Sequence, residues 1–556
     1  MAFISPIMQI QAAARTLLAA RYLLPGETPE DLVARVARGV DPSRGTEYRR
    51  LMEDLLFLPN TPTLMNAGTP DGQLAACFVI PVEDSLPGIF RALTDMALIH
   101  QSGGGTGFSF SRIRPRGDRV NGTLGVANGP IPFIRVFNEA TNAVKQGGKR
   151  RGANMGVLAS SHPDIRDFIA AKLDGGIRNF NLSVGFDRKF FDCMAAGRDY
   201  DLVNPRDGSV GDRIQPVLLW EQLTGAAWRT GDPGVLFFDT INEKSTLPGL
   251  GPLEATNPCG EQPLLPYESC NLGSVNLSRM IRGGEIEWDL LRDTVRTGVR
   301  FLDAVIDATV FPVPEIRTRT LETRKIGLGV MGLADAFILL GIPYESDEAL
   351  DLAGRIMAFI QKEARGMSQE LGEEKGSFPA IDKSIFSGPA RNATVTTIAP
   401  TGSLHLIAGT SGGIEPVFSL AYRRTIDEAP IEFFHPVLAD YLAGLQGSGG
   451  LDFEGTVRKT GSVQDLPLPD EIKDLYRTAP EISPEHHVRM QAVFQKHVEN
   501  AVSKTVNLPE QATPSDVGKI YLLARELGCK GITVYRYNSR PDQVLSRGCE
   551  TCRADN

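Results

Sequence analysis

The stretch Asn257-Pro-Cys259-Gly-Glu261, followed by Cys270-Asn271-Leu-Gly, is the most informative part of this 556-residue chain. It places a cysteine between an amide and a carboxylate, on a loop that proline and glycine bend. Asn257 can hold a hydroxyl by hydrogen bonding and Glu261 can take its proton, so the pattern suits radical or nucleophilic chemistry on a polyol. A free cysteine is more often a small buried hydrophobe, but polar and acidic neighbours are a poor setting for an inert thiol. We therefore predict that Cys259 is reactive.

The composition is that of a soluble globular protein. The 58 basic and 67 acidic residues give a net charge of −9, and 42% of the chain is hydrophobic. A net anion is a poor general binder of nucleic acid or membrane surfaces. The 57 glycines exceed the ordinary level of about 7%, which indicates backbone loops close to a ligand. We expect a cytoplasmic protein, because no segment has the pattern of a signal peptide or a membrane span and the seven cysteines are odd in number.

Short apolar runs alternate with helical patterns from Phe57 onward, which predicts an α/β fold. Three regions are expected: an N-terminal helical region (1–55), one large catalytic domain (56–537) and a flexible C-terminal tail (538–556). The clearest expected elements are a helix capped at Thr28, a strand at Ala393–Ala399, a helix that begins at Pro484 and keeps one apolar face to Val502, a helix that begins at Pro514, and a strand at Gly531–Tyr535.

Seven motifs follow one another over about 500 residues. They are Phe57-Leu-Pro-Asn-Thr-Pro-Thr-Leu-Met-Asn-Ala-Gly68, Cys77, Gln146-Gly-Gly-Lys-Arg-Arg-Gly152, Asn257-Pro-Cys-Gly-Glu261, Ala399-Pro-Thr-Gly-Ser403, Gly413-Ile-Glu-Pro416 and the pair Cys549/Cys552. In this order they resemble the ribonucleotide reductases, and within that family the adenosylcobalamin-dependent class II enzymes. The resemblance runs from about Tyr22 to the C-terminus.

This resemblance implies roles for the residues of the first motif described. Cys259 corresponds to the thiyl radical that abstracts the 3′-hydrogen of a ribonucleotide, Glu261 to the base on the 3′-hydroxyl, and Asn257 to a hydrogen-bond partner of the sugar hydroxyls. Cys77 and Cys270 correspond to the dithiol that protonates the departing 2′-hydroxyl and supplies two electrons. They lie 193 residues apart in the sequence, so only the fold can bring them together.

Substrate contacts are implied at further positions. Thr401, Gly402 and Ser403 follow a predicted strand and match the family's phosphate-binding turn, where backbone N–H groups and hydroxyls face the phosphates. Thr61 matches a hydroxyl used on the same phosphates. Ala76 stands where many family members carry a serine, so this chain lacks that hydroxyl.

The basic, glycine-rich loop around residues 145–151 is unusual in an acidic chain. A solvated surface loop is the plain interpretation, whereas the resemblance implies a specificity loop that reads an effector nucleotide at a dimer interface. Lys145, Gln146 and Arg150 would then contact substrate or effector. Three other residues match effector-site positions, with the first on ribose and the last on phosphate: Asp84, Ser85 and Arg112.

Cys549 and Cys552 form a Cys-x-x-Cys pair in a polar tail. The resemblance implies a redox shuttle that exchanges with the active-site disulfide and passes it to thioredoxin, which requires an exposed dithiol on a flexible arm. The alternative is half of a zinc site, which would need two more thiol or imidazole ligands. Cys193 and Cys529 lie in helical patterns and are expected in the core.

Gly327-Leu-Gly329-Val-Met-Gly332 satisfies the dinucleotide-binding fingerprint. Such a fingerprint must follow a buried strand, whereas the preceding residues 317–324 are too polar to form one. In the family that this chain resembles, the stretch opens a barrel helix. We therefore expect no binding of NAD, although a nicotinamide oxidoreductase stays among the alternatives.

The main alternative within the family is the class I large subunit, which receives its radical from a separate metal subunit. Its relay uses two adjacent tyrosines, whereas Tyr535-Arg536-Tyr537 separates them here. The glycyl-radical class needs a C-terminal glycine motif and a four-cysteine zinc site, which the sequence lacks. No Asp-x-His-x-x-Gly motif occurs, so no protein side chain is expected to ligate cobalt. A non-catalytic nucleotide-binding regulator would have lost the reactive cysteines, which are all present.

The resemblance also implies the fold and the partners. The fold is a ten-stranded α/β barrel made of two antiparallel five-stranded halves, with Cys259 on a finger loop through its middle, shielded from water. The implied substrates are ribonucleotides, which we expect to be diphosphates although the sequence leaves triphosphates open, and they are reduced for DNA synthesis with adenosylcobalamin (vitamin B12) as cofactor. A dNTP or ATP effector, thioredoxin and a second copy of the chain are the implied partners. About 55 residues precede the core, so no ATP-cone domain is expected.

Overall fold

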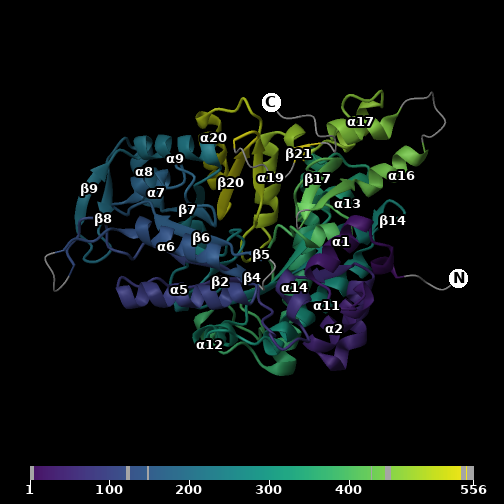
Figure 1. Ribbon diagram of the computed structural model, residues 1–556, viewed down its shortest axis with the longest axis horizontal. Helices are drawn as coiled ribbons and strands as arrows, with labels where there is room; N and C mark the ends of the chain where they lie inside the picture. Colours follow the sequence, from purple (N-terminus) through teal and green to yellow (C-terminus); the bar gives the residue numbers. More distant parts are fainter. Residues whose placement is uncertain are drawn as a thin grey trace.

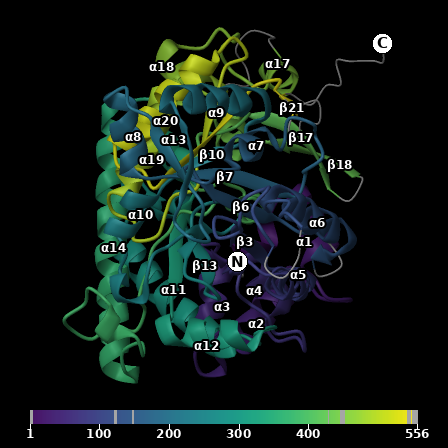
Figure 2. The same cartoon turned by 90° about the vertical axis from the view of Figure 1, so that its left-hand side faces the viewer.

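A computed structural model describes residues 5–120, 125–146, 150–426, 429–444, 452–539 and 546–547. The chain begins with three helices, α1 (Ala12–Arg21), α2 (Pro29–Val40) and α3 (Gly45–Glu53). The predicted cap is confirmed, because the side chain of Thr28 accepts a hydrogen bond from Asp31 N and the Asp31 carboxylate accepts one from Thr28 N. Helices α2 and α3 pack against the long helix α11 (Trp288–Ala308), which in turn packs against α14 (Asp347–Lys375) (Figures 1 and 2).

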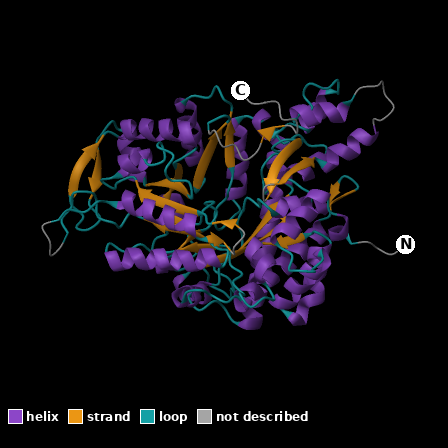
Figure 3. Cartoon of the chain, in the orientation of Figure 1, coloured by secondary structure: helices purple, strands orange, loops and turns teal. Residues whose placement is uncertain are grey.

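Five parallel strands form the first half of a barrel. In spatial order they are β2 (Cys77–Val79), β3 (Gly105–Ser109), β6 (Asn154–Ala159), β7 (Phe180–Phe186) and β10 (Gly234–Phe237). The helices that connect them are α5 (Leu86–Gln101), α6 (Pro130–Ala143), α7 (Ile165–Ala170), α8 (Arg188–Ala195) and α9 (Pro216–Thr230), with the hairpin β8 (Tyr200–Val203) and β9 (Val210–Ile214) between the last two. Figure 3 shows helices on the outside of the strands.

The second half runs in the opposite direction. It contains β13 (Ser269–Asn276), β16 (Ile326–Met331), the extended segments 394–398 and 500–503, β19 (Thr505–Leu508), which continues the latter, and β20 (Gly531–Arg536). Parallel bridges Leu328↔Thr396 and Ile398↔Val502 join its middle members. The two halves meet through antiparallel pairs β13–β2 and β10–β20, so the ring of ten strands closes. The short strand β1 (Phe57–Pro59) pairs with β13 beside the ring.

The helices of the second half cover its outer face. They are α11, α12 (Pro314–Thr323), α13 (Leu333–Leu340), α14, α15 (Leu404–Ala408), α16 (Pro436–Gly444), α17 (Phe453–Thr460), α18 (Asp470–Leu475), α19 (Pro484–Gln495) and α20 (Pro514–Glu526), with the hairpin β17 (Ala421–Ile426) and β18 (Ala429–Phe434) beside them. The barrel interior is a separate apolar cluster that includes Cys77, Met155, Val157, Cys270 and Leu272. Cys193 and Cys529 lie in the outer core of the first half, as predicted.

Two predicted elements differ from the structure. Residues 327–331 belong to strand β16 rather than to the start of a helix, and α13 begins only at Leu333. Their glycines serve close packing inside the barrel, because a Cβ on Gly329 would lie 2.3 Å from the carbonyl oxygen of Thr397. Helix α19 ends at Gln495, and Val502 lies in the extended segment that bridges to Ile398. The apolar residues continue at helical spacing beyond α19 because the helix and the segment after it both pack into the same hydrophobic core.

Candidate active site

The predicted finger loop passes through the barrel. Strands β11 (Ala255–Thr256) and β12 (Pro263–Leu264) form a two-stranded hairpin, and residues 257–262 connect them. Both barrel halves hold this loop. Asn181 Nδ2 donates to the carbonyl oxygen of Pro258 at 2.8 Å from the first half, and Ala501 N donates to that of Glu261 at 2.9 Å from the second.

Glycines on the barrel wall allow the loop to approach. A Cβ on Gly107 of β3 would lie 1.7 Å from the carbonyl oxygen of Thr256, and one on Gly105 would lie 2.9 Å from Pro258. The loop itself turns at Gly260, whose φ of +81° favours glycine. Within the loop, the Asn257 side-chain oxygen accepts a hydrogen bond from Gln262 N at 2.9 Å. This contact fixes the orientation of the Asn257 amide.

The fold brings Cys77 and Cys270 together. They are direct cross-strand partners in the antiparallel pair of β2 and β13. Opposed residues in such a pair have Cα atoms about 4.5–5.5 Å apart, which lies within the range that a disulfide spans. Asn257 Nδ2 donates to Cys77 Sγ at 3.1 Å, so the finger loop contacts this cysteine pair directly. Burial raises the pKa of both thiols well above the usual range.

Glu261 is buried beside the same groups. Burial raises the pKa of Glu261 to about 7, against the opposing effect of a hydrogen bond from Asn257. Its Oε2 atom has no hydrogen-bond partner among the described residues. A carboxyl group with a pKa near neutrality and a vacant acceptor position can take a proton from a substrate hydroxyl.

Cys259 is exposed, in contrast to the expected shielding from water. It opens into a cavity of about 310 Å³ that Asn181, Ser183, Lys504 and Tyr535 also line. The loop places Cys259 at the space between β7, β20 and the start of β19, while Asn257 of the same loop contacts Cys77. This cavity is the place where a ligand would cover the thiol.

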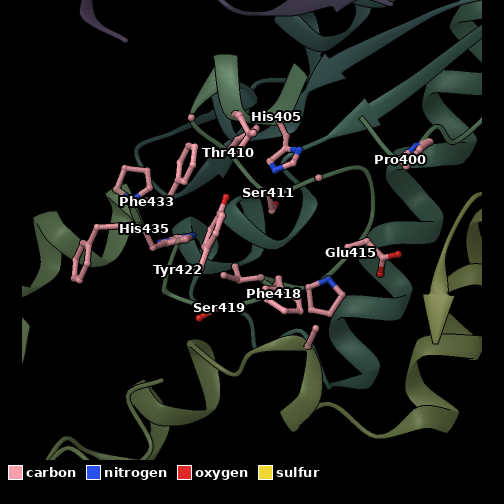
Figure 4. A pocket seen from close by; sticks show the side chains of 18 of the residues that line it. Pro400, His405, Thr410, Ser411, Glu415, Phe418, Ser419, Tyr422, Phe433 and His435 are labelled. Carbon is pink, nitrogen blue, oxygen red and sulfur yellow. The ribbon is translucent and has the colours of Figure 1, made fainter. Parts of the chain in front are cut away.

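A second cavity of about 460 Å³ adjoins the first. Pro400, Thr505 and Tyr535 line both cavities and thus form a shared wall. Figure 4 shows Tyr422 and Phe433 on one side of the second cavity and Glu415 on the other. The Tyr422 and Phe433 rings stack with centroids 5.0 Å apart.

An ion pair between a buried lysine and a half-buried glutamate lies at this shared wall. Lys504 lines the first cavity and Glu415 the second, and they form a salt bridge. Lys504 Nζ also donates to His487 Nδ1 at 2.9 Å, and Glu415 Oε1 accepts from Thr505 N at 2.7 Å. These contacts fix the start of β19. Glu415 lies in the Gly413–Pro416 motif and could be predicted as a site residue from the sequence, whereas Lys504 and His487 lie in no motif.

The predicted phosphate-binding turn precedes α15. Thr401 has a φ of +50°, and its hydroxyl oxygen accepts a hydrogen bond from Gly413 N at 2.8 Å, so the turn is held to the Gly413–Pro416 motif. Ser403 directly precedes α15, and Gly402 is exposed. Thr61 lies at the start of α4 (Thr61–Asn66) and shares a hydrogen bond of 3.0 Å with the hydroxyl of Tyr22. Helix α1, which ends before Tyr22, packs against α15 and thereby links the two sites.

The effector-site residues pair with neighbours. Arg114 Nε donates to the Asp84 carboxylate at 2.8 Å, whereas Arg112 forms a bidentate salt bridge with Glu254. The structure therefore brings Arg114, rather than Arg112, to Asp84. Ser85 caps α5 by accepting from Gly88 N. Arg114 was missed because it falls in no motif, although it lies two residues from the predicted arginine.

Other predicted residues lie partly or wholly outside the described part of the chain. Strands β4 (Lys145–Gln146) and β5 (Arg150–Arg151) form a hairpin, but only their backbone is described. Cys549 and Cys552 lie outside the described residues, and Ala76 directly precedes β2. Within the described ranges, no cluster of three or more His, Cys, Asp or Glu residues could hold a metal ion, and no helix is long and apolar enough to span a bilayer.

Comparisons with known proteins agree with this geometry. The family model for the ribonucleotide reductase barrel domain matches residues 75–389 and 381–535, and that for the ribonucleotide reductase all-alpha domain matches residues 8–72. A vitamin B12-dependent ribonucleoside-diphosphate reductase of Mycobacterium tuberculosis is 48% identical, with 97% of this chain and 81% of the relative covered. One of Thermoplasma acidophilum with the same name is 49% identical, with coverages of 90% and 66%.

A solved structure shares the fold. It is the class Id ribonucleotide reductase alpha subunit of Actinobacillus ureae, with a TM-score of 0.80 and 23% identity over 95% of this chain and 97% of the other. The predicted family and the predicted barrel are both confirmed.

Proposed function

Because the chain belongs to the ribonucleotide reductase family, we propose that it reduces ribonucleoside diphosphates to 2′-deoxyribonucleotides in a vitamin B12-dependent reaction. One observation carries the proposal: Cys77 and Cys270 are opposed on neighbouring strands directly beside Asn257 and Glu261 of the finger loop. Two thiols that can close one disulfide supply the two electrons that replacement of a hydroxyl by hydrogen requires. The names of the two relatives support the choice of diphosphates and of the cofactor.

The proposed reaction begins at Cys259. Its thiyl radical takes the 3′-hydrogen of the ribose, while Glu261 accepts the 3′-hydroxyl proton and Asn257 holds a sugar hydroxyl. A radical at C3′ eases loss of the 2′-hydroxyl, which leaves as water with a proton from the Cys77–Cys270 pair. The pair then becomes a disulfide, its second hydrogen goes to C2′, Glu261 returns its proton to the 3′ oxygen, and the 3′-hydrogen returns from Cys259. The sum is one ribonucleotide and two thiols converted to one deoxyribonucleotide, water and a disulfide.

The two adjoining cavities fit the cofactor in part. Adenosylcobalamin, when bound, supplies the carbon-centred radical that oxidises the Cys259 thiol. The 460 Å³ cavity has the size and the mixture of aromatic and polar lining of a nucleoside-sized site, and it shares a wall with the Cys259 cavity. Tyr422 and Phe433 offer apolar faces and Glu415 offers a carboxylate, so these residues would hold the adenosyl group. The corrin ring is larger than this cavity, so the cavity accounts only for the adenosyl part of the cofactor.

A homodimer is part of the proposal. Helices α5 and α6 pack together on one side of the barrel (Figure 1), and they carry exposed apolar side chains at Leu86, Phe90, Leu98 and Val136. A grouped set of exposed apolar side chains indicates a protein contact. Hairpin β4–β5 follows α6 directly, so an effector bound there would lie next to the partner. The other proposed partners are thioredoxin, through Cys549 and Cys552, and a dNTP or ATP effector, in the cytoplasm.

The test of this function removes the radical-bearing sulfur. Cys259→Ser is expected to abolish turnover of CDP and to leave its affinity for CDP unchanged, measured by anaerobic assay and equilibrium dialysis. Cys193→Ala, in the outer core of the first barrel half, is the control and should retain activity. Full activity of Cys259→Ser would overturn the assignment.

A further inference from the structure

A buried lysine lies beside one of the two paired cysteines. Asn271 of β13 pairs with Ile326 of β16 in parallel register. Cys270 and Lys325 directly precede these two residues, so they are neighbours across the same strand pair. Lys325 is 3% exposed. The preceding residue, Arg324, forms a buried salt bridge of 2.8 Å with Asp303.

The ammonium group of Lys325 lies on the face of the strand that carries Cys270. Lys325 Nζ donates to Glu268 Oε2 at 2.8 Å, and both side chains are buried. Glu268 and Cys270 are two residues apart in an extended segment. The pairing of β13 with β2 continues to Glu268, because the carbonyl oxygen of Glu268 accepts a hydrogen bond from Val79 N. Residues two apart in a strand project to the same face. Glu268 Oε2 also accepts from Leu265 N at 2.6 Å, whereas its Oε1 has no partner among the described residues.

The two cysteines therefore differ in the charges around them. Burial raises the pKa of Cys270, Lys325 lowers it, and Glu268 and Glu261 add smaller contributions that raise it. At Cys77 the charged groups with the largest effects are Glu261, Cys270 and Cys259, all of which raise its pKa, and only the neutral amide of Asn257 opposes them. A thiolate in a buried site is stabilised more by a full positive charge than by a neutral donor.

We propose that Lys325 makes Cys270 the sulfur that leaves when the Cys77–Cys270 disulfide is reduced, so that the incoming thiolate attacks Cys77. This inference rests on the proposed function of the pair as the reducing dithiol. The attacking thiolate forms a bond to Cys77 Sγ, the bond between Cys77 and Cys270 breaks, and Cys270 departs as a thiolate next to Lys325. The second thiol of the reductant then displaces Cys77, so two electrons pass from the external dithiol, which ends as a disulfide. Lys325 is thus a positioning residue that acts through Cys270.

The test maps the mixed disulfide. The chain with Cys549→Ser and Cys552→Ser is oxidised by one turnover with CDP, treated with excess 2-mercaptoethanol, quenched in acid at short times and digested for mass spectrometry. Acid stops exchange because it protonates thiolates. At least about tenfold more mercaptoethanol on Cys77 than on Cys270 is expected. Equal labelling, or an excess on Cys270, would overturn the proposal. If no Cys77–Cys270 disulfide forms during turnover, the proposed function of the pair fails instead.

Variants of the lysine test the cause. Lys325→Met should abolish the preference for Cys77 and slow reduction of the oxidised protein about tenfold, whereas Lys325→Arg should keep both near the parent values. Lys172→Met removes a different, largely buried lysine, which pairs with Asp232 at 2.9 Å, and serves as the control. An unchanged preference in folded Lys325→Met, or an equal loss in Lys172→Met, would contradict a role for the Lys325 charge.

Discussion

Glu261 connects the burial of a single carboxyl group to the pH dependence of the proposed reaction. It acts as a base only when ionised, and burial raises its pKa to about 7. Activity should therefore rise as the pH increases through about 7. Glu261→Gln keeps the shape and removes the base, so kcat is expected to fall by about 100-fold or more. The pH profile of kcat from pH 5.5 to 8.5 measures both. A rise through pH 7 that persists in Glu261→Gln would assign it to another group.

Ionisation of the buried Glu261 carboxyl group lowers the stability of the folded protein. Its pKa in the folded protein lies above the ordinary value of 4.5, so stability is highest below pH 4.5 and is lost as the pH rises through about 7. Above that pH the loss amounts to about 3 kcal/mol. Glu261→Gln should therefore be more stable than the parent at pH 8.5 and nearly equal at pH 4.5, as chemical denaturation at the two pH values would measure. An equal difference at both pH values would contradict the raised pKa.

At the scale of elements, the finger loop depends on glycines in the strands around it. Gly107→Ala would place a Cβ 1.7 Å from the carbonyl oxygen of Thr256, so the loop must move. We expect the free energy of unfolding to fall by about 1–3 kcal/mol and turnover to fall at least tenfold, because Cys259 shifts with the loop. Gly211→Ala in β9, where no atom lies within 4 Å of the added carbon, is the control. Parent-like turnover in Gly107→Ala would show that the loop does not need this approach.

The sequence predicted elements whose signals are local. Thr28 and Pro484 marked helix starts correctly, because caps depend on residues three positions apart. The glycines at 327 and 329 were wrongly assigned to the start of a helix. They are needed because segment 394–398 and the finger loop, about 70 residues away in the chain, approach their strand closely.

The same distinction holds for the site. The motif at 257–261 identified the loop residues that the structure brings to the Cys77–Cys270 pair. Lys325 and Lys504 carry no motif, and their partners Glu268 and Glu415 lie 57 and 89 residues away. Only the closed ring of strands brings them together. The tendency of Cys259 to face a cavity could not be predicted either, since it depends on which way the loop turns inside the barrel.

At the scale of the whole molecule, the proposed reaction requires reducing equivalents to enter a closed barrel. Ser539 is the last described residue before the tail segment, and β20 ends close by with Tyr535 lining both cavities. Cys549 lies ten positions after Ser539, and that length of extended chain spans at most about 35 Å. The segment between Ser539 and Cys549 is therefore long enough for Cys549 to reach the end of the barrel where Tyr535 lies.

Removal of the tail thiol should separate the two reductants. Cys549→Ser is expected to lose thioredoxin-coupled turnover and to keep activity with dithiothreitol, which can enter the barrel itself. Parallel assays of CDP reduction with each reductant measure this, and Cys193→Ala is again the control. An equal loss with both reductants would argue against a shuttle.

The central claim is that this chain alone performs cobalamin-dependent ribonucleotide reduction. The most direct measurement is an anaerobic assay of the purified chain with CDP, an effector nucleotide and dithiothreitol, with and without adenosylcobalamin. We predict a deoxycytidine product that forms only when the cobalamin is present. Absence of product from both CDP and CTP, or product that forms equally without cobalamin, would contradict the account.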